Sequence, residues 1–99
     1  MEILDQFTSW VRKISYIATK HGFVVEVEIQ ENYFTKIILD SDSYISEITL
    51  WKNNNLFEAE ILDVRSSTTI YVDSGEYDTS INFSTFFNKF LKILELDVD

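Results

Sequence analysis

The sequence predicts an α+β fold, a two-layer sandwich in which helices cover one face of a five-stranded antiparallel sheet. Apolar residues recur at helical spacing near both ends of the chain, over residues 3–21 and 83–94. Between these segments, apolar and polar residues alternate over short runs, which is the period of half-buried strands. Short polar connections between consecutive runs favour an antiparallel meander. Because both helices must bury an apolar stripe, one face of the sheet is expected to accept them.

The first helix is predicted to extend from Ile3 to His21. Gly22 follows Lys20 and His21, an order typical of a helix C-terminus, where glycine ends the helix and cationic side chains complement the dipole. The apolar residues follow i, i+3, i+4 and i+7 spacing, which defines one stripe. This stripe contains Ile3, Leu4, Phe7, Trp10, Val11, Ile14, Ile17 and Ala18.

The middle of the chain is expected to form strands joined by polar turns. In the first and fourth strands, apolar side chains alternate with pairs of glutamates. The register of the third strand stays open, because Ile45 and Trp51 have the opposite parity to Ile48 and Leu50. The turn at residues 52–55 is rich in asparagine, which tolerates the left-handed conformation of tight hairpins. The expected strands are residues 23–29, 34–40, 44–51, 56–64 and 68–73.

The last helix is expected to begin near residue 83, with Ser80 or Asn82 as its N-cap. Its stripe is rich in phenylalanine, which indicates packing into the core. The stripe consists of Phe83, Phe86, Phe87, Phe90, Leu91, Ile93 and Leu94. The sequence contains no proline, repeat or low-complexity stretch, so residues 1–99 are expected to form a single domain.

The second face of the predicted sheet is left uncovered, and the alternation assigns acidic and aromatic residues to it. Carboxylates alone are typical of a solvated face, whereas aromatic side chains among charges are typical of protein interfaces. Trp51 and Tyr71 are equally compatible with a position at the edge of the core. The residues expected on this face are Glu26, Glu28, Glu47, Thr49, Trp51, Glu58, Glu60, Leu62, Tyr71 and Asp73.

The net charge of the chain favours a basic partner over nucleic acid. Its 99 residues include 17 Asp and Glu against 8 Lys and Arg, a formal net charge of −9. A negative field of this size repels nucleic acid and speeds encounter with a basic partner. The chain has no cysteine, which excludes disulfides and thiolate metal sites and fits a reducing compartment. The acidic N-terminus and short apolar runs favour a cytoplasmic protein without a signal peptide or membrane span.

Residue types that carry catalysis or bind metals occur only in weak patterns. His21 lies at a predicted helix end and has no cysteine or serine motif to pair with. The glutamate pairs of the first and fourth strands offer oxygen ligands or an acid–base pair, but water-facing strands carry such pairs routinely. The acidic turn at residues 40–43 lacks the glycine and glutamate of a calcium loop. We therefore expect a binding protein with no enzymatic activity, cofactor, metal or small-molecule substrate.

With these elements placed, the chain resembles the TriTu family of bacterial immunity proteins. The resemblance covers nearly the whole chain and consists of aromatic positions, strand patterns and turns. The turn at Lys52–Asn55 departs from it, since a glycine is expected after Trp51, although asparagine can replace glycine there. The segments that carry the resemblance are Phe7–Trp10, Gly22–Val27, Ile37–Ser41, Tyr44–Trp51 and Glu60–Val64.

The resemblance implies a protein that binds and neutralises a cognate toxin. Many contact-dependent and polymorphic toxins are nucleases, whose substrate clefts must be positive to hold phosphates. An acidic protein can fill such a cleft or bind beside it and block substrate by its bulk. A small acidic secretion chaperone and an enzyme that uses the strand carboxylates are the alternatives. The residues expected to contact the toxin are Glu26, Glu28, Glu47, Trp51, Glu58, Glu60, Tyr71 and Asp73.

Overall fold

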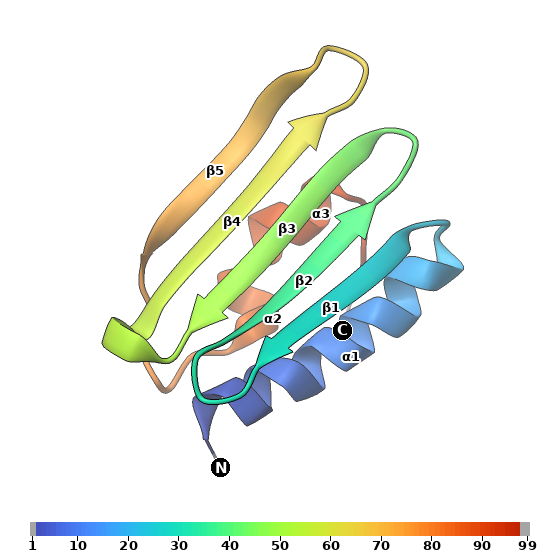
Figure 1. The fold of residues 1–99 in the computed structure, drawn as a ribbon. Coiled ribbons are helices and arrows are strands. Elements are labelled where there is room, and N and C mark those ends of the chain that lie inside the picture. Colours follow the sequence, from blue (N-terminus) through green and yellow to red (C-terminus); the bar gives the residue numbers. More distant parts are fainter. Residues whose placement is uncertain (1, 98–99) are drawn as a thin grey trace.

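A computed structural model describes residues 2–97 of the chain, so residues 1 and 98–99 of the expected domain lie outside the described residues. Figure 1 shows a long helix, a sheet and a short helical segment, in chain order. The elements are α1 (Ile3–Lys20), β1 (Val24–Gln30), β2 (Phe34–Asp40), β3 (Tyr44–Trp51), the 3₁₀ turn η1 (Asn53–Asn55), β4 (Leu56–Asp63), β5 (Thr68–Glu76), α2 (Phe83–Phe86) and α3 (Asn88–Ile93).

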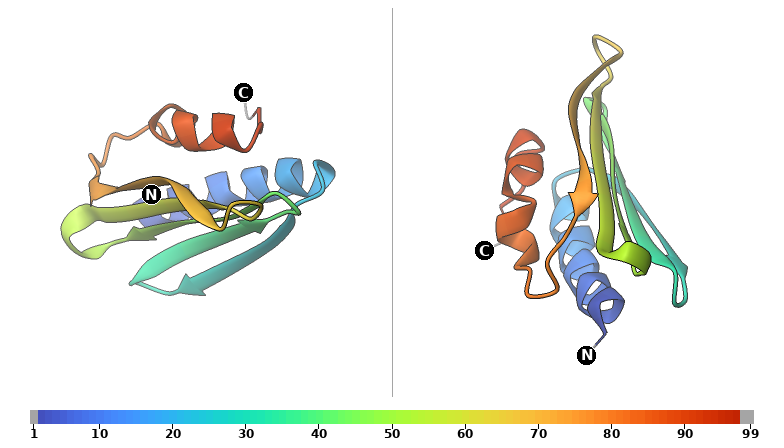
Figure 2. Two further views of the ribbon diagram at one scale, coloured as in Figure 1. Left: turned by 90° about the horizontal axis from the view of Figure 1, so that it is seen from above. Right: turned by 90° about the vertical axis from the view of Figure 1, so that its left-hand side faces the viewer.

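The described residues form one antiparallel sheet with the strand order β1-β2-β3-β4-β5. Figure 2 shows all the helices on one side of this sheet. Helix α1 contacts β1, β2 and β3, while rings of α2 and α3 pack on β4 and β5. The predicted α+β fold with a meander sheet is therefore confirmed, and within residues 2–97 one face of the sheet has no second layer.

Helix α1 forms because its apolar residues make a single stripe, and this stripe enters the core as predicted. Phe7, Val11 and Ile14 are almost completely buried. The helix ends at Lys20, with His21 as its C-cap, and Gly22 follows with a φ of +90°, a conformation that glycine adopts without strain. The carbonyl of Ala18 accepts from the N–H groups of both His21 and Phe23, and the N–H of Gly22 donates to the carbonyl of Thr19, so these carbonyls at the helix end are satisfied.

The core lies between the helices and the inner face of the sheet, and it decides the register of β3. Ile48 pairs with Ile37 on β2 and with Ala59 on β4, and all of these side chains are buried. Ile45 and Trp51 consequently face the other way. The ambiguity in the third strand is resolved by the partners of Ile48, because a buried face needs apolar side chains on every neighbouring strand.

The C-terminal segment differs from the single helix that its periodicity predicts. It forms two short helices that are separated at Phe87, whose φ of −99° and ψ of 22° interrupt the helical turn. The rings of Phe86 and Phe87 both pack edge-on against Phe57, with centroid separations of 4.8 Å and 5.9 Å, and the ring of Phe87 also lies 5.6 Å from that of Trp10. The predicted N-cap Asn82 is confirmed, since its side chain accepts a 3.0 Å hydrogen bond from the N–H of Thr85.

Candidate partner-binding site

The side of the sheet that faces away from the helices, which we call the open face, carries a patch of carboxylates. Register places Glu47 of β3 directly opposite Glu60 of β4, while Glu58 lies opposite Thr49 in the next row. Carboxylate oxygens of these three glutamates lie within 4.8 Å of one another. Glu26 and Glu28 of edge strand β1 face the same side. We define the acidic patch as Glu26, Glu28, Glu47, Glu58 and Glu60.

Lys36 of β2 is the one Lys or Arg among the described strand residues of the open face. Its Nζ lies 2.9 Å from a carboxylate oxygen of Glu47. The hydrogen bond to Glu47 is the main cause that raises the pKa of Lys36, and the charges of Glu28 and Glu58 act in the same direction. The lysine stays protonated at neutral pH and offsets only one of the surrounding carboxylates. The open face therefore keeps a concentrated negative potential.

The same carboxylates are the residues that a metal would use. Oxygens from Glu47, Glu58 and Glu60 at this separation are the type of donor that hard cations take. These side chains are exposed or half-buried, and Lys36 already places a positive charge beside Glu47. Exposed acidic groups at such distances are common without an ion. The arrangement is suited to receive positive charge, whether from a cation or from basic side chains of a partner.

Trp51 supplies a large apolar side chain at one end of the open face. It pairs with Phe34 across β2–β3 and is half-buried. A shallow groove of about 470 Å³ lies beside Trp51. This groove is lined by Trp51, Asn53, Asn54, Leu56, Phe57, Glu58, Ser74 and Gly75. An aromatic ring beside an apolar groove is typical of the centre of a protein interface, and the neighbouring carboxylate is typical of its rim.

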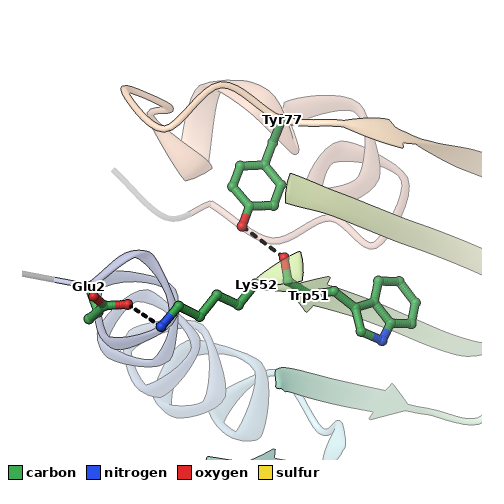
Figure 3. Close-up of polar contacts among 4 residues, drawn as sticks. All are labelled: Glu2, Trp51, Lys52 and Tyr77. Carbon is green, nitrogen blue, oxygen red and sulfur yellow. Dashed lines mark hydrogen bonds and ion pairs between the residues drawn. The ribbon is translucent and has the colours of Figure 1, made fainter. Parts of the chain in front are cut away.

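The backbone around Trp51 is held from several directions. Figure 3 shows the Tyr77 hydroxyl, which donates a 2.8 Å hydrogen bond to the carbonyl of Trp51, while the indole points away from this contact. The next residue, Lys52, forms a 3.0 Å ion pair with Glu2, and its N–H donates to the carbonyl of Tyr33. The turn that follows Trp51 is therefore held at three places: by Glu2 beside α1, by Tyr33 in the β1–β2 turn and by Tyr77 after β5. Trp51 is thus presented on a rigid support, which lowers the entropy cost of binding through it.

Two residues predicted for the open face lie on the covered face instead. Tyr71 pairs with Ile61 and Asp73 pairs with Ala59, whose side chains point into the core. The ring of Tyr71 packs edge-on against Phe90 at 6.1 Å, and burial is the main cause that raises the pKa of its phenol. The placement of both residues on the open face was therefore wrong. β5 contains a run of neighbouring apolar residues, so its sequence does not show which side faces the core. The packing of Tyr71 on Phe90 decides which residues lie on the covered face.

Some residues of the open face were not named as candidates. Phe34, Lys36 and Ile38 lie there because their neighbours Thr35 and Ile37 are buried in the core. The parity of β2 contains this information, since Ile37 and Leu39 define its inner side. Val72 of β5 is also exposed on the open face, opposite Glu60. The remaining predicted residues, Glu26, Glu28, Glu47, Thr49, Trp51, Glu58, Glu60 and Leu62, occupy the open face.

A larger groove, of about 660 Å³, lies in the helical layer beside Lys13, Ser84 and Lys92. Its polar groups are hydroxyls, amides and charged ends at the protein surface. It combines neither a cluster of like charges nor an exposed aromatic ring. We therefore regard the open face, which has both, as the stronger candidate site despite its flatter shape.

These observations define a two-layer α+β protein with an acidic, uncovered sheet face. Compared with protein families, residues 5–93 match the family described as Immunity protein TriTu, and the chain belongs to this family. Its general role is that of an immunity protein, whose partner is a toxin protein. Comparison with curated proteins finds no match. Within residues 2–97, no helix has both the length and the apolar character needed to cross a membrane.

Proposed function

We propose that this immunity protein neutralises its toxin by forming a stoichiometric complex through the open face, without enzymatic turnover. The observation that carries the proposal is the grouping of Glu47, Glu58 and Glu60, whose carboxylate oxygens lie within 4.8 Å of one another. Concentrating like charges on a sheet destabilises the folded chain. A partner that brings positive charge to this surface would offset that repulsion on binding.

The toxin surface that fits the acidic patch is basic, and we propose the substrate cleft of a nuclease. Such a cleft presents Lys and Arg side chains that hold phosphates. Glutamates of the acidic patch can occupy the positions of those phosphates, because a carboxylate accepts the same charge-assisted hydrogen bonds. The formal net charge of −9 would also accelerate the encounter. The expected place of action is the cytoplasm of the cell that the protein protects.

The proposal is tested by reversing charge within the acidic patch and, as a control, outside it. The variant Glu58→Lys with Glu60→Lys alters two strand positions that face solvent. The control Glu31→Lys with Glu95→Lys alters two exposed residues outside the strands. Both variants carry a formal net charge of −5, since each exchange adds two to the native −9. We expect association with the toxin to slow by about tenfold or more only in the first variant.

The measurements are association rates of the purified proteins and survival of cells that express the toxin. Equal loss in both variants would mean that total charge, and not the acidic patch, drives binding. Normal binding by both would place the interface elsewhere, with the loops after Asp40 and after Glu76, where β5 ends, as the next candidates. Competition between the immunity protein and nucleic acid for the toxin tests the nuclease cleft separately. A toxin that stays folded in the complex contradicts the secretion-chaperone alternative, because such chaperones bind unfolded segments.

A further inference from the structure

Strand β1 forms one edge of the sheet and is regular over its whole length. Each residue from Val24 to Gln30 has one partner on β2, with no shift in register. In the described residues, the carbonyl of Gln30 is the β1 group that bonds to backbone outside the sheet, through the N–H of Tyr33. The outward N–H and C=O groups of β1 thus form a row that can pair with another strand.

The side chains of β1 are amphipathic and largely exposed. Val27 and Ile29 lie on the covered face, 42% and 49% exposed, and neither belongs to the core cluster. Glu26 and Glu28 lie exposed on the open face, between these residues in sequence. Exposed apolar residues at an edge remain available for a further strand. The edge therefore offers alternating apolar and acidic positions to whatever pairs with it.

The opposite edge, β5, is protected from strand pairing. Its pairing with β4 contains an irregularity at Ile61/Leu62, and Asp73 directs a charge toward the covered face. Gly75 follows, opposite Phe57, and leaves no side chain for an added strand to pack against. Bulges and inward-pointing charges are devices by which sheets block edge pairing. β1 has neither, so the two edges differ in the property that decides strand addition.

We propose that β1 adds a strand from the toxin: an extended segment whose residues alternate between apolar and basic side chains. This inference rests on the proposed function and extends the acidic patch to the sheet edge. The apolar side chains of the segment would cover Val27 and Ile29. Its Lys or Arg side chains would lie opposite Glu26 and Glu28, at the separation of about 5 Å of directly paired residues. Main-chain hydrogen bonds would add affinity, and the alternation would give specificity.

Charge distinguishes this occupant from a second copy of the chain. Two β1 strands that pair with each other would bring Glu26 and Glu28 of one copy against those of the other. Like charges directly opposite each other on a sheet are destabilising, and each copy carries a formal net charge of −9. The same glutamates attract a basic segment. They therefore oppose self-association while they favour the toxin strand.

Amide hydrogen exchange of the full-length protein, alone and with bound toxin, tests the inference. We expect the outward amides of β1 to exchange rapidly in the free protein and at least tenfold more slowly in the complex. The outward amides at the start of β5, which lies away from the groove beside Trp51, serve as the internal control and should not change. A complex that forms normally and is weakened by Glu58→Lys with Glu60→Lys, yet leaves β1 amides unprotected, overturns strand addition and keeps the proposed function. Failure to bind the toxin at all overturns the proposed function itself.

A pair of matched variants adds a second measurement. Ile29 and Ile70 are isoleucines on the two edge strands, with exposed fractions of 49% and 47%. We expect Ile29→Lys to lower toxin affinity by about tenfold, because the lysine opposes a basic strand and removes an apolar contact. Ile70→Lys makes the same charge change and should stay within about twofold, while Ile29→Val should retain affinity. Protection of β1 amides in the free protein that rises with its concentration would identify a second copy as the occupant and overturn the inference.

Discussion

The two faces of the sheet are built from alternate residues of the same strands, yet they have different tasks. On the covered face, Ile37, Leu39 and Ile48 are at most 1% exposed. On the open face, their neighbours Lys36 and Glu47 form an ion pair with about a third of each side chain exposed. Burial on one face stabilises the fold, and charge on the other is available to a partner. The difference teaches that folding and recognition can be changed separately, one residue apart.

The largest test of this comparison uses Trp10, the tryptophan of the covered side. The residue is 9% exposed, its ring packs among those of Phe7, Phe83 and Phe87, and its indole N–H donates a 2.9 Å hydrogen bond to the Ser84 hydroxyl. Trp10→Ala should lower the free energy of unfolding by about 3–5 kcal/mol, since it leaves a cavity and removes the hydrogen bond. Urea unfolding measures this change. A loss below about 1 kcal/mol would contradict the assignment of the covered face as the core.

The second test uses Trp51, the tryptophan of the open face. This residue does not belong to the core cluster, and its indole points away from the contacts that hold its backbone. Trp51→Ala should weaken toxin binding by roughly 2 kcal/mol, about thirtyfold in affinity, if it acts as an interface anchor. The unfolding free energy should change much less than in Trp10→Ala. Calorimetric titration measures the affinity of the variants for the toxin, and thermal unfolding measures their stability. Normal binding together with a large loss of stability in Trp51→Ala would make Trp51 a structural residue.

The alternation of polar and apolar residues predicts most of the two faces, because β1, β2 and β4 each have one clearly apolar side. In β3 both parities contain apolar residues, and the partners of Ile48 decide its register. It fails at β5, where Ile70, Tyr71 and Val72 are consecutive apolar residues and either parity is acceptable. The choice is made by the ring of Phe90, which contacts Tyr71 from a segment far along the chain. A local sequence pattern carries no information about a contact between such distant residues.

The break in the C-terminal helix was also missed because it depends on contacts between residues that are far apart in the sequence. A stripe of phenylalanines predicts which residues become buried, and Phe83, Phe87 and Phe90 are indeed buried. It does not specify that Phe86 packs on Phe57 and remains 39% exposed. For the candidate site, parity predicts which strand residues share a face. Their distances from one another, the support of Trp51 by Tyr77 and the contrast between the two edges all depend on strand register.

The smallest expected effect concerns the lysine within the acidic patch. Lys36 pairs with Glu47 at 2.9 Å, and Lys52 pairs with Glu2 at 3.0 Å beside α1, so the two form a matched pair. Lys36→Gln and Lys52→Gln should each change the unfolding free energy by less than about 1 kcal/mol, because exposed ion pairs contribute little. Since Glu47 raises the pKa of Lys36 above 10.5, its charge is lost only as pH rises past that range. Measurements at neutral pH therefore compare a charged with an uncharged side chain.

The two lysines differ in what the toxin would encounter, and ionic strength separates their effects. At about 0.01 M salt the Debye length is about 30 Å, so either exchange makes the whole protein more attractive to a basic partner and should raise the association rate. At about 0.15 M it is about 8 Å, and only charge close to the interface still acts. Lys36→Gln should then keep a faster association than wild type, while Lys52→Gln should match wild type. Dissociation rates should change less in both. Identical salt dependence of the two variants would mean that the acidic patch lies outside the contact surface.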